Sequence, residues 1–302
     1  MDLSVAIGST TLSNPVGVAS GTFGYGSEYE DLIDFSAIGA LYTKAVTLAP
    51  RPGNDMPRIV ETPSGILNSI GLANVGVERF LSEKMPYCAR LPCAIIVNVA
   101  GASIDEYGMV VDRLEGSDAI SGYEINISCP NVKHGGMAFG TDPATVTDLT
   151  ANLRKRTKRP LIVKLTPNVT DIALIARAAQ DGGADAVSCI NTLVGMVIDV
   201  SAKRPVLPLR TGGLSGPAIR PIGVAATFAV SRAVAIPVIG VGGIASGNDA
   251  LEYLLAGASA IQIGTANFVD PSTAAQVLAG IRAFAEREKM TCIKDFHQFI
   301  PR

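Results

Sequence analysis

The chain has 302 residues, of which 48% are hydrophobic and 17% charged, and its net charge is -2. This size and composition provide enough apolar side chains for one large α/β core. No stripe of Lys or Arg is evident and no apolar run reaches the roughly 18 residues of a spanning helix, so we expect a cytoplasmic protein without a nucleic-acid or membrane partner.

Short β-rich runs recur along the chain after a predicted β-hairpin over residues 3–15. Each run is short and apolar on both faces, which is typical of parallel strands covered on both sides. The segments between them, such as residues 170–184, have helical spacing and end in Gly. This alternation predicts a closed (β/α)8 TIM barrel in one domain over residues 1–302. The eight runs begin at residues 16, 40, 94, 123, 161, 186, 237 and 260.

Two connections are much longer than the others. Residues 45–93 follow the second strand and residues 192–236 follow the sixth. Both begin at the carboxyl end of a strand, which is the end where a barrel of this kind carries its chemistry. We therefore predict long active-site insertions at both places.

Polar residues gather at the predicted carboxyl ends of the strands, which face one shared cavity in such a barrel. Lys44 and Lys164 together favour an anionic ligand, although either lysine alone could be a solvated residue at the rim. Three amides suit a ring with alternating carbonyl and N–H groups, such as a pyrimidine or a flavin, although each could instead satisfy loop backbone. The strand-end residues are Ser20, Lys44, Asn98, Asn126, Lys164, Asn191, Thr192, Gly242, Gly243, Gly264 and Thr265.

Glycine-containing segments follow the last two strands: GVGGIASG over residues 240–247 and IGTANF over residues 263–268. At these positions a barrel binds phosphate, because Gly lets backbone amides approach the phosphate oxygens. The first segment also fits the GxGxxA dinucleotide fingerprint. That fingerprint requires an acidic residue at the end of the next strand, where this chain has Gln262. The phosphate pocket is therefore the favoured interpretation.

The five cysteines, at positions 88, 93, 129, 189 and 292, form no CxxC pair. They therefore predict no disulfide framework, no metal site and no iron-sulfur cluster in this chain. Cys88 and Cys93 are expected in a loop before the third strand. Cys129, in EINISCPN, follows a strand and has Asn126 and Asn131 on either side, and only this thiol has a polar neighbourhood that singles it out.

The motifs TKAVTL, NSIGLAN, NISCPN, IVKLTP, CINT, GGLSGPAI, GVGGI and QIGTA occur in this order. With them the chain resembles the dihydroorotate dehydrogenase family, specifically its class 1B catalytic subunits. The resemblance implies a (β/α)8 barrel that binds FMN and oxidises dihydroorotate to orotate in pyrimidine biosynthesis. It makes Cys129 the base that removes the C5 proton while hydride leaves C6 for flavin N5.

The resemblance also assigns binding residues. Lys44 would be shared between the flavin and the substrate carboxylate, Lys164 would stabilise negative charge on the reduced flavin, and residues 131–140, with His134, would form a lid. Implied substrate contacts are Lys44, Asn68, Ser69, Ile70, Gly71, Leu72, Asn126, Asn191 and Thr192. Implied flavin contacts are Ser20, Lys44, Ala45, Asn98, Asn126, Lys164, Ile190, Gly216, Gly242, Gly243, Gly264 and Thr265.

Reoxidation of the flavin requires an exit for electrons that this sequence does not carry. Class 1B members pass electrons to NAD through a partner subunit with FAD and a [2Fe-2S] cluster, in a heterotetramer with a homodimeric core. A class 1A homodimer that uses fumarate is the nearest alternative. A phosphate-binding barrel lyase with Lys164 as a Schiff-base amine is an alternative from another class.

Overall fold

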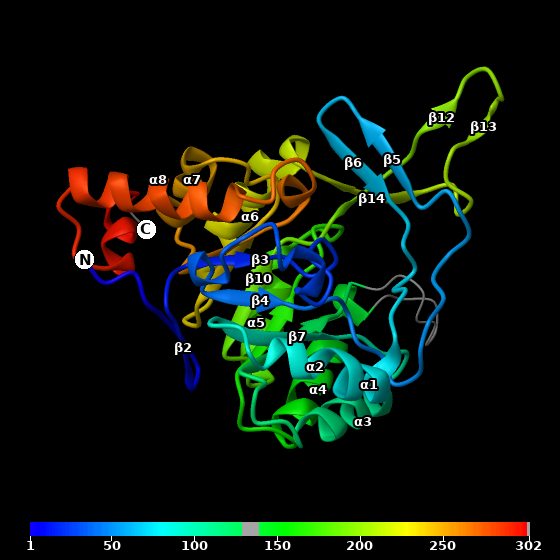
Figure 1. Ribbon diagram of the computed structural model, residues 1–302, viewed down its shortest axis with the longest axis horizontal. Coiled ribbons are helices and arrows are strands. Elements are labelled where there is room, and N and C mark those ends of the chain that lie inside the picture. The colour runs from blue at the N-terminus through cyan, green and yellow to red at the C-terminus, as the bar shows by residue number, and fades with distance from the viewer. Residues whose placement is uncertain (129–138, 301–302) are drawn as a thin grey trace.

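The computed structural model describes residues 1–128 and 139–300 (Figure 1). Eight parallel strands close into a barrel in the order in which they follow one another along the chain, which confirms the predicted (β/α)8 fold. The β-hairpin predicted at the amino end is also present, formed by β1 (Val5–Ile7) and β2 (Thr10–Leu12). The barrel strands are β3 (Val16–Val18), β4 (Ala40–Tyr42), β7 (Ala94–Val99), β8 (Gly122–Asn126), β9 (Leu161–Lys164), β10 (Ala186–Cys189), β15 (Val238–Val241) and β16 (Ala260–Ile263).

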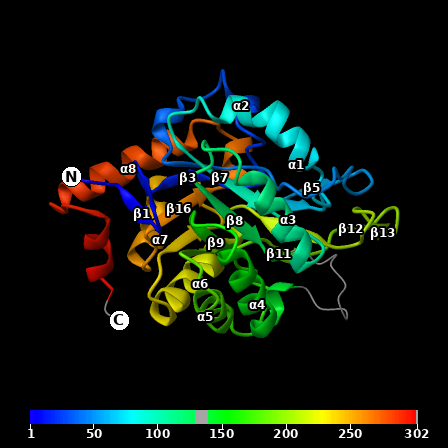
Figure 2. The same ribbon diagram turned by 90° about the horizontal axis from the view of Figure 1, so that it is seen from below.

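Helices surround the barrel (Figure 2). Several begin at a residue whose side chain accepts a hydrogen bond from the first turn, namely Ser103, Asp142, Asp171 and Ser246. Such caps satisfy backbone N–H groups that the helix itself leaves unpaired. The helices are α1 (Gly76–Arg79), α2 (Met85–Cys88), α3 (Ile104–Leu114), α4 (Pro143–Arg154), α5 (Ile172–Asp181), α6 (Arg220–Ala233), α7 (Gly247–Leu255) and α8 (Thr273–Arg287). Shorter turns are η1 (Ser27–Tyr29), η2 (Phe35–Ala37), the π-helical η3 (Phe80–Lys84), η4 (Phe139–Thr141), η5 (Pro217–Ile219), η6 (Thr265–Phe268) and η7 (Ile293–Gln298).

The two long insertions meet in a second sheet. Its strand order is β11-β14-β6-β5, and all neighbours are antiparallel. Strands β5 (Ile59–Thr62) and β6 (Gly65–Asn68) come from the first insertion, and β11 (Leu193–Gly195) and β14 (Gly212–Ser215) from the second. The sheet projects from the barrel at the upper right of Figure 1. Both insertions therefore lie where active-site excursions were predicted, and they hold each other in place.

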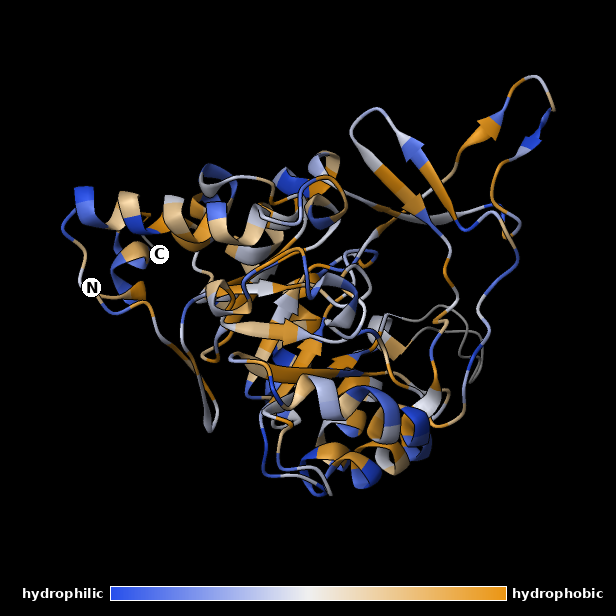
Figure 3. Cartoon of the chain, in the orientation of Figure 1, coloured by the Kyte–Doolittle hydropathy of each residue, from blue (hydrophilic) through white to orange (hydrophobic). Residues whose placement is uncertain are grey.

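A two-stranded hairpin, β12 (Ile198–Asp199) and β13 (Arg204–Pro205), extends furthest from the barrel (Figure 3). Ile198 and Val200 near its tip are exposed, and they lie outside the core. The core itself fills the space between the barrel and its helices. Within the described part of the chain, no helix has the length and apolar character needed to cross a bilayer.

Candidate active site

The parallel barrel brings the carboxyl ends of its strands together, and the strand register shows which site residues are neighbours. Asn126 at the end of β8 pairs with Lys164 at the end of β9. Asn98 on β7 pairs with Glu124 on β8, and Lys164 pairs with Ser188 on β10. Side chains alternate along a strand, so Glu124 and Asn126 lie on the same face of β8. Four neighbouring strands thus contribute polar side chains to the barrel interior.

Glu124 is the centre of this polar cluster and is fully buried. Its Oε2 accepts hydrogen bonds from Asn98 Nδ2 at 2.6 Å and from Ser20 Oγ at 3.0 Å. Its Oε1 accepts from Gln262 Nε2 at 2.8 Å and from Ser188 Oγ at 2.9 Å. The barrel thus surrounds one carboxylate with neutral donors from four other positions.

Lys164 supplies the opposite charge. Its Nζ lies 3.6 Å from Glu124 Oε2, and its side chain is only 5% exposed. The same ammonium donates a hydrogen bond to Ser20 Oγ at 3.1 Å. A buried lysine with these two partners is a fixed part of the site, which excludes the alternative of a solvated residue at the rim.

Glu124 is held in its charged form. Burial alone would raise the pKa of its carboxyl group, but Lys164 and the surrounding donors outweigh burial, and the pKa is lowered from its ordinary value. Hydrogen bonds to the charged form and a nearby ammonium both favour ionisation. The interior therefore contains a carboxylate and an ammonium that compensate each other.

Sequence reasoning missed Glu124, Ser188 and Gln262 as site residues. One interior layer of a (β/α)8 barrel is built by side chains from alternate strands. Tyr42, Glu124, Ser188 and Gln262 come from the second, fourth, sixth and eighth barrel strands and so match one such layer. The signal that could have found Glu124 is its place in YEIN, where a charged residue interrupts a buried strand two positions before Asn126. A charge on the inward face of such a strand must have a partner inside the barrel.

One buried acceptor in the cluster is left without a partner. The amide of Asn98 is completely buried, and it donates from Nδ2 to Ser20 Oγ as well as to Glu124. Its Oδ1 has no hydrogen-bond partner among residues 1–128 and 139–300. An unpaired buried carbonyl costs free energy, so this oxygen is suited to an N–H donor of a ligand at the strand ends.

The glycines predicted to bind phosphate lie close together. A Cβ added at Gly243 would stand 2.8 Å from the carbonyl oxygen of Gly216, and one at Gly216 would stand 3.6 Å from Thr265 Cγ2. Gly216 and Gly243 have φ values of 99° and 67°, which Gly tolerates far better than other residues. Thr265 Oγ1 donates to Ser215 Oγ at 2.8 Å. Among the described residues, the N–H groups of Gly242 and Gly243 donate to no acceptor, so they remain available to an anion.

Tyr253 supports this glycine loop from behind. Its hydroxyl donates to the carbonyl oxygen of Gly242 at 2.6 Å. The ring needs glycines around it, because a Cβ at Gly223 would lie 2.0 Å from its hydroxyl oxygen and one at Gly240 would lie 2.3 Å from Cδ1. Asp249 fixes the end of the same loop by accepting from the N–H of Ala245 at 3.0 Å. Helix α7 therefore determines how the loop presents its amides.

The second sheet brings two of the predicted substrate residues together. Asn68 Nδ2 donates to the carbonyl oxygen of Gly213 at 3.0 Å. Thr192 packs against the same residue, since a Cβ on Gly213 would stand 2.1 Å from Thr192 Oγ1. Asn68 and Thr192 thus meet at Gly213, although they belong to different insertions.

Comparison with known proteins gives a family for this arrangement. The family model described as dihydroorotate dehydrogenase matches residues 2–284. The chain belongs to the dihydroorotate dehydrogenase family. It is 52% identical, over 97% of both chains, to a Pelobacter propionicus protein named dihydroorotate dehydrogenase B (NAD(+)), catalytic subunit. It is 50% identical to the Geobacter sulfurreducens protein of the same name, over 97% of this chain and 96% of that one.

A solved structure supports the family fold. The dihydroorotate dehydrogenase of Eimeria tenella, in complex with ferulenol, superposes with a TM-score of 0.79. The match covers 97% of this chain and 87% of that one at 23% sequence identity. At this identity the likeness bears on the fold, and it agrees with the closed barrel described above.

Other residues implied by the family resemblance lie near the carboxyl ends of the barrel strands, and among the described residues their side chains make no hydrogen bond to Glu124. The N–H of Lys44 donates to the carbonyl oxygen of Gly24 at 2.7 Å, and the adjacent Ala45 is buried. Asn126 Oδ1 accepts from the N–H of Ser128, and Asn191 Oδ1 accepts from the N–H of Thr192. The remaining members are Ile190, which is buried after β10, and Gly264, which follows β16.

The family segment from Asn68 to Leu72 is shaped by Asn54. Asn54 Nδ2 donates to both the carbonyl oxygen and the hydroxyl of Ser69, at 3.1 and 3.0 Å. The N–H of Ser69 donates to the carbonyl oxygen of Arg58 at 2.7 Å. Gly71 has a φ of 73°, and a Cβ there would lie 2.4 Å from Asn54 Oδ1. Ile70 accepts from the N–H of Asn54, so the loop 68–72 is held against residues 54–58.

The family's implied base, Cys129, lies outside the described residues, as does His134 of the implied lid. Among the described thiols, burial raises the pKa of Cys88 to about 11 and that of Cys93 to about 12. Burial also raises the pKa of Cys189. These three are therefore poorly suited to act as thiolate bases near neutral pH. The expectation that Cys88 lies in a loop is wrong, because it is the last residue of α2.

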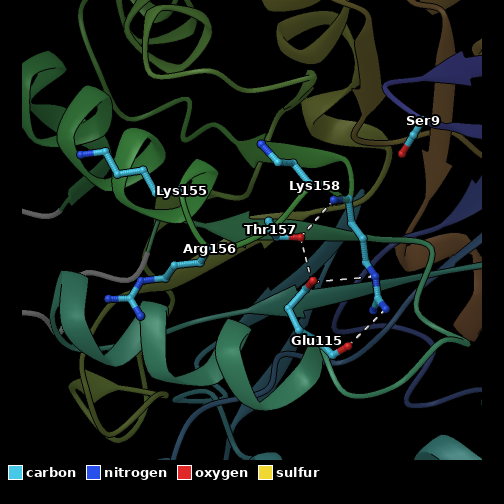
Figure 4. A pocket seen from close by; sticks show the side chains of 7 residues that line it. Ser9, Glu115, Lys155, Arg156, Thr157 and Lys158 are labelled. Carbon is cyan, nitrogen blue, oxygen red and sulfur yellow. Dashed lines mark hydrogen bonds and ion pairs between the residues drawn. The ribbon is translucent and has the colours of Figure 1, made fainter.

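A basic cavity, whose lining side chains are drawn in Figure 4, lies at the opposite end of the barrel, next to the amino end of β9. Residues 154–159 read RKRTKR, so the prediction that no Lys or Arg stripe exists is wrong for this segment. Most of the run lines the cavity together with Ser9 and Glu115, between α4 and β9. Its arginines are paired: Arg154 with Asp185 at 2.7 Å, Arg156 with Asp112, and Arg159 with Glu115 at 3.8 Å. This cavity is separate from the family site at the carboxyl ends of the strands.

Proposed function

We propose that the chain oxidises dihydroorotate to orotate in pyrimidine biosynthesis, with FMN bound at the carboxyl ends of the barrel strands. The observation that carries this proposal is the 52% identity, over 97% of both chains, to a relative named dihydroorotate dehydrogenase B (NAD(+)), catalytic subunit. The clustered strand-end residues support it independently, because they match the chemistry of a phosphorylated, ring-containing ligand.

The residues at the strand ends fit FMN. The unpaired Asn98 Oδ1 is an acceptor for a ring N–H, and the free amides of Gly242 and Gly243 are donors for a phosphate. Gly21 leaves open space beside Ser20, since a Cβ there would meet no atom of the described residues within 4 Å. When bound, FMN would supply a two-electron acceptor for hydride from the substrate. Ser20, Lys44, Ala45, Asn98, Asn126, Lys164, Ile190, Gly216, Gly242, Gly243, Gly264 and Thr265 would hold it.

Cys129 would act as the general base. The Cys129 thiolate would take the C5 proton of dihydroorotate, and the C5–H electron pair would form the C5=C6 double bond of orotate as hydride leaves C6, for which FMN would supply the acceptor. The support from the described residues is that Asn126, three positions before Cys129 in the sequence, ends β8 and pairs with Lys164 at the end of β9. A positioned base of this kind contributes roughly 10²- to 10⁴-fold to a rate.

The substrate would lie between the two insertions. Lys44 would neutralise the carboxylate of dihydroorotate, and amides of Asn68, Asn126 and Asn191 would pair with its ring carbonyl and N–H groups. Thr192 and the loop from Ser69 through Ile70 and Gly71 to Leu72 would complete the contacts. The support for this placement is that Asn68 and Thr192 already meet at Gly213.

The names of these relatives also support a partner subunit. These proteins are called catalytic subunits and are named for NAD(+). We propose that electrons leave this chain, a single domain over residues 1–302, through a partner subunit with FAD and [2Fe-2S], in a heterotetramer around a homodimer. Class 1A enzymes, which use fumarate, are the second candidate within the family.

The lyase alternative is disfavoured by the ion pair in the barrel. A Schiff-base lysine must present a neutral amine to a carbonyl group. Lys164 instead lies 3.6 Å from a buried, ionised carboxylate and donates to Ser20. Its amine is thus already engaged by these two partners.

The first test is the absorbance of the purified protein and the identity of the flavin that heat releases. FMN in about equal amount to the chain supports the proposal. A colourless protein that fails to bind added FMN would contradict it and would return attention to a non-redox activity.

A further inference from the structure

We propose that Glu124 balances the charge of Lys164 and thereby keeps the reduction potential of the bound flavin lower than Lys164 alone would set it. This inference rests on the proposed function. It goes beyond that function because it assigns a role in tuning the flavin to a residue in the barrel interior.

The first step is geometric. Glu124 is fully buried and Lys164 nearly so, and their charged atoms lie 3.6 Å apart. Ser20 Oγ bridges the pair, since it accepts from Lys164 Nζ at 3.1 Å and donates to Glu124 Oε2 at 3.0 Å. Any ligand that contacts Lys164 or Ser20 therefore contacts a direct partner of a buried carboxylate.

The second step concerns charge. The side chains bonded to Glu124, apart from Lys164, are neutral: Ser20, Asn98, Ser188 and Gln262. One ammonium and one carboxylate thus give this cluster a net charge of zero. Charges inside a protein interact strongly because little water screens them, so the carboxylate weakens the field of the lysine at the ligand.

The third step links this field to the redox reaction. Reduction adds negative charge to the flavin ring at N1 and O2, where the family resemblance places Lys164. A lone lysine would stabilise that charge and raise the potential, whereas the compensated pair does so less. A lower potential makes the reduced flavin a better donor of its two electrons to the next acceptor. Glu124 therefore favours passage of electrons out of the chain.

The test is an anaerobic redox titration of the FMN-bound protein and of variants that change the charge. Glu124→Gln leaves the cluster with a net positive charge and should raise the midpoint potential by at least 30 mV, which is a tenfold change in a two-electron equilibrium. Lys164→Gln leaves a net negative charge and should lower it by a comparable amount. The double variant is neutral again and should return toward the parent value.

Ser188→Ala is the matched control. It removes the 2.9 Å hydrogen bond to Glu124 Oε1 and changes no charge, so it should shift the potential less than either charged substitution. An equal shift would show that hydrogen bonding, and not charge, sets the potential. An unchanged or lowered potential in Glu124→Gln would overturn the proposal.

The test still works if a variant loses its flavin, and failure of this inference can be told apart from failure of the proposed function. If Glu124→Gln does not retain FMN, the same balance is measured by comparing Lys164→Gln with the double variant, whose potential should be the higher. A double variant at or below the value of Lys164→Gln would overturn the charge balance. A parent protein that binds no flavin would overturn the proposed function itself. If dihydroorotate reduces the bound flavin but all variants have the same midpoint potential, only this inference is overturned.

Discussion

At the scale of single residues, Glu124 depends on its neighbours for its charge. The pKa of its carboxyl group is lower in the folded chain than the ordinary value of 4.5, because Lys164 and neutral donors outweigh the effect of burial. A group with a lowered pKa stabilises the fold above its unfolded-state pKa, and this contribution is lost as the pH falls through the folded-state value. The interior of the barrel is therefore a site of acid sensitivity.

Glu124→Gln should make thermal stability less dependent on pH in acid. We expect the parent's melting temperature to fall more steeply than the variant's as the pH drops below about 4.5. The measurement is a series of thermal unfolding curves between about pH 3 and pH 6. Glu83→Gln is the control, because Glu83 forms an exposed pair with Arg79 that solvent screens, and its curve should follow the parent's. Equal slopes for parent and Glu124→Gln would contradict the ionised state of Glu124.

Cys129→Ala should keep the flavin and lose most of its reduction by dihydroorotate, by roughly 10²- to 10⁴-fold, because no base remains for the C5 proton. Cys129→Ser should be slow near neutral pH and should recover as the pH rises, since a hydroxyl is a much weaker acid than a thiol. Rapid anaerobic mixing measures both rates. Cys93→Ala, before the amino end of β7, is the control and should reduce at the parent rate. A Cys129→Ala rate equal to the parent's would exclude the base role.

At the scale of elements, the glycine loop after β15 and helix α7 act together. Tyr253 on α7 donates to the carbonyl oxygen of Gly242, and this contact would hold the next N–H groups in position for the proposed phosphate. The loop itself was predictable from GVGGIASG, because glycines after the seventh strand are typical of a phosphate pocket. The hydrogen bond from Tyr253 to Gly242 was not predictable, because the two residues are 11 positions apart and their contact depends on how α7 packs on the barrel.

Tyr253→Phe should weaken FMN binding about two- to tenfold, because a single hydrogen bond contributes roughly 0.5–1.5 kcal/mol. Binding of riboflavin, which lacks the phosphate, should change little. Titration of the flavin-free protein with each ligand measures both affinities by fluorescence. An equal loss for FMN and riboflavin would mean that the hydroxyl supports the fold and not the phosphate loop.

The eight barrel strands were predictable for a physical reason. Strands covered on both faces must be apolar throughout, so VGVAS, LIVKLT and AIQIGTA are evident in the sequence. The second sheet was not found, because β5 and β11 are only half covered and because the pairing that joins the two insertions, β6 with β14, links strands far apart in the sequence. Such strands carry little apolar signal, and their pairing is decided by the folded barrel that brings the insertions together.

At the scale of the whole molecule, the polar interior and the two insertions lie at one end of the barrel, and the basic cavity lies at the other. The cluster of polar residues at the strand ends was predictable, because the topology of a barrel determines which strand ends lie close together. The charge inside it was not, since the lysines at the strand ends could be recognised, whereas the carboxylate that pairs with Lys164 was hidden within a strand. The proposed ligand site therefore lies next to a charge-compensated barrel interior.

The isolated chain should reduce its flavin with dihydroorotate and transfer few electrons to NAD. Addition of the electron-transfer subunit from the same source should restore NAD reduction, because the proposed route leaves this chain through a partner. Steady-state assays with NAD and with fumarate, with and without that subunit, measure the difference. Rapid turnover of the isolated chain with fumarate would instead favour the class 1A alternative.

The most direct test of the central claim is an anaerobic titration of the FMN-bound chain with dihydroorotate, in which flavin absorbance and product are measured together. The account predicts that each flavin reduced is matched by one orotate formed, since hydride and proton leave the same substrate molecule in one conversion. Flavin that stays oxidised while dihydroorotate is present in excess, or absorbance that falls without orotate appearing, would contradict it.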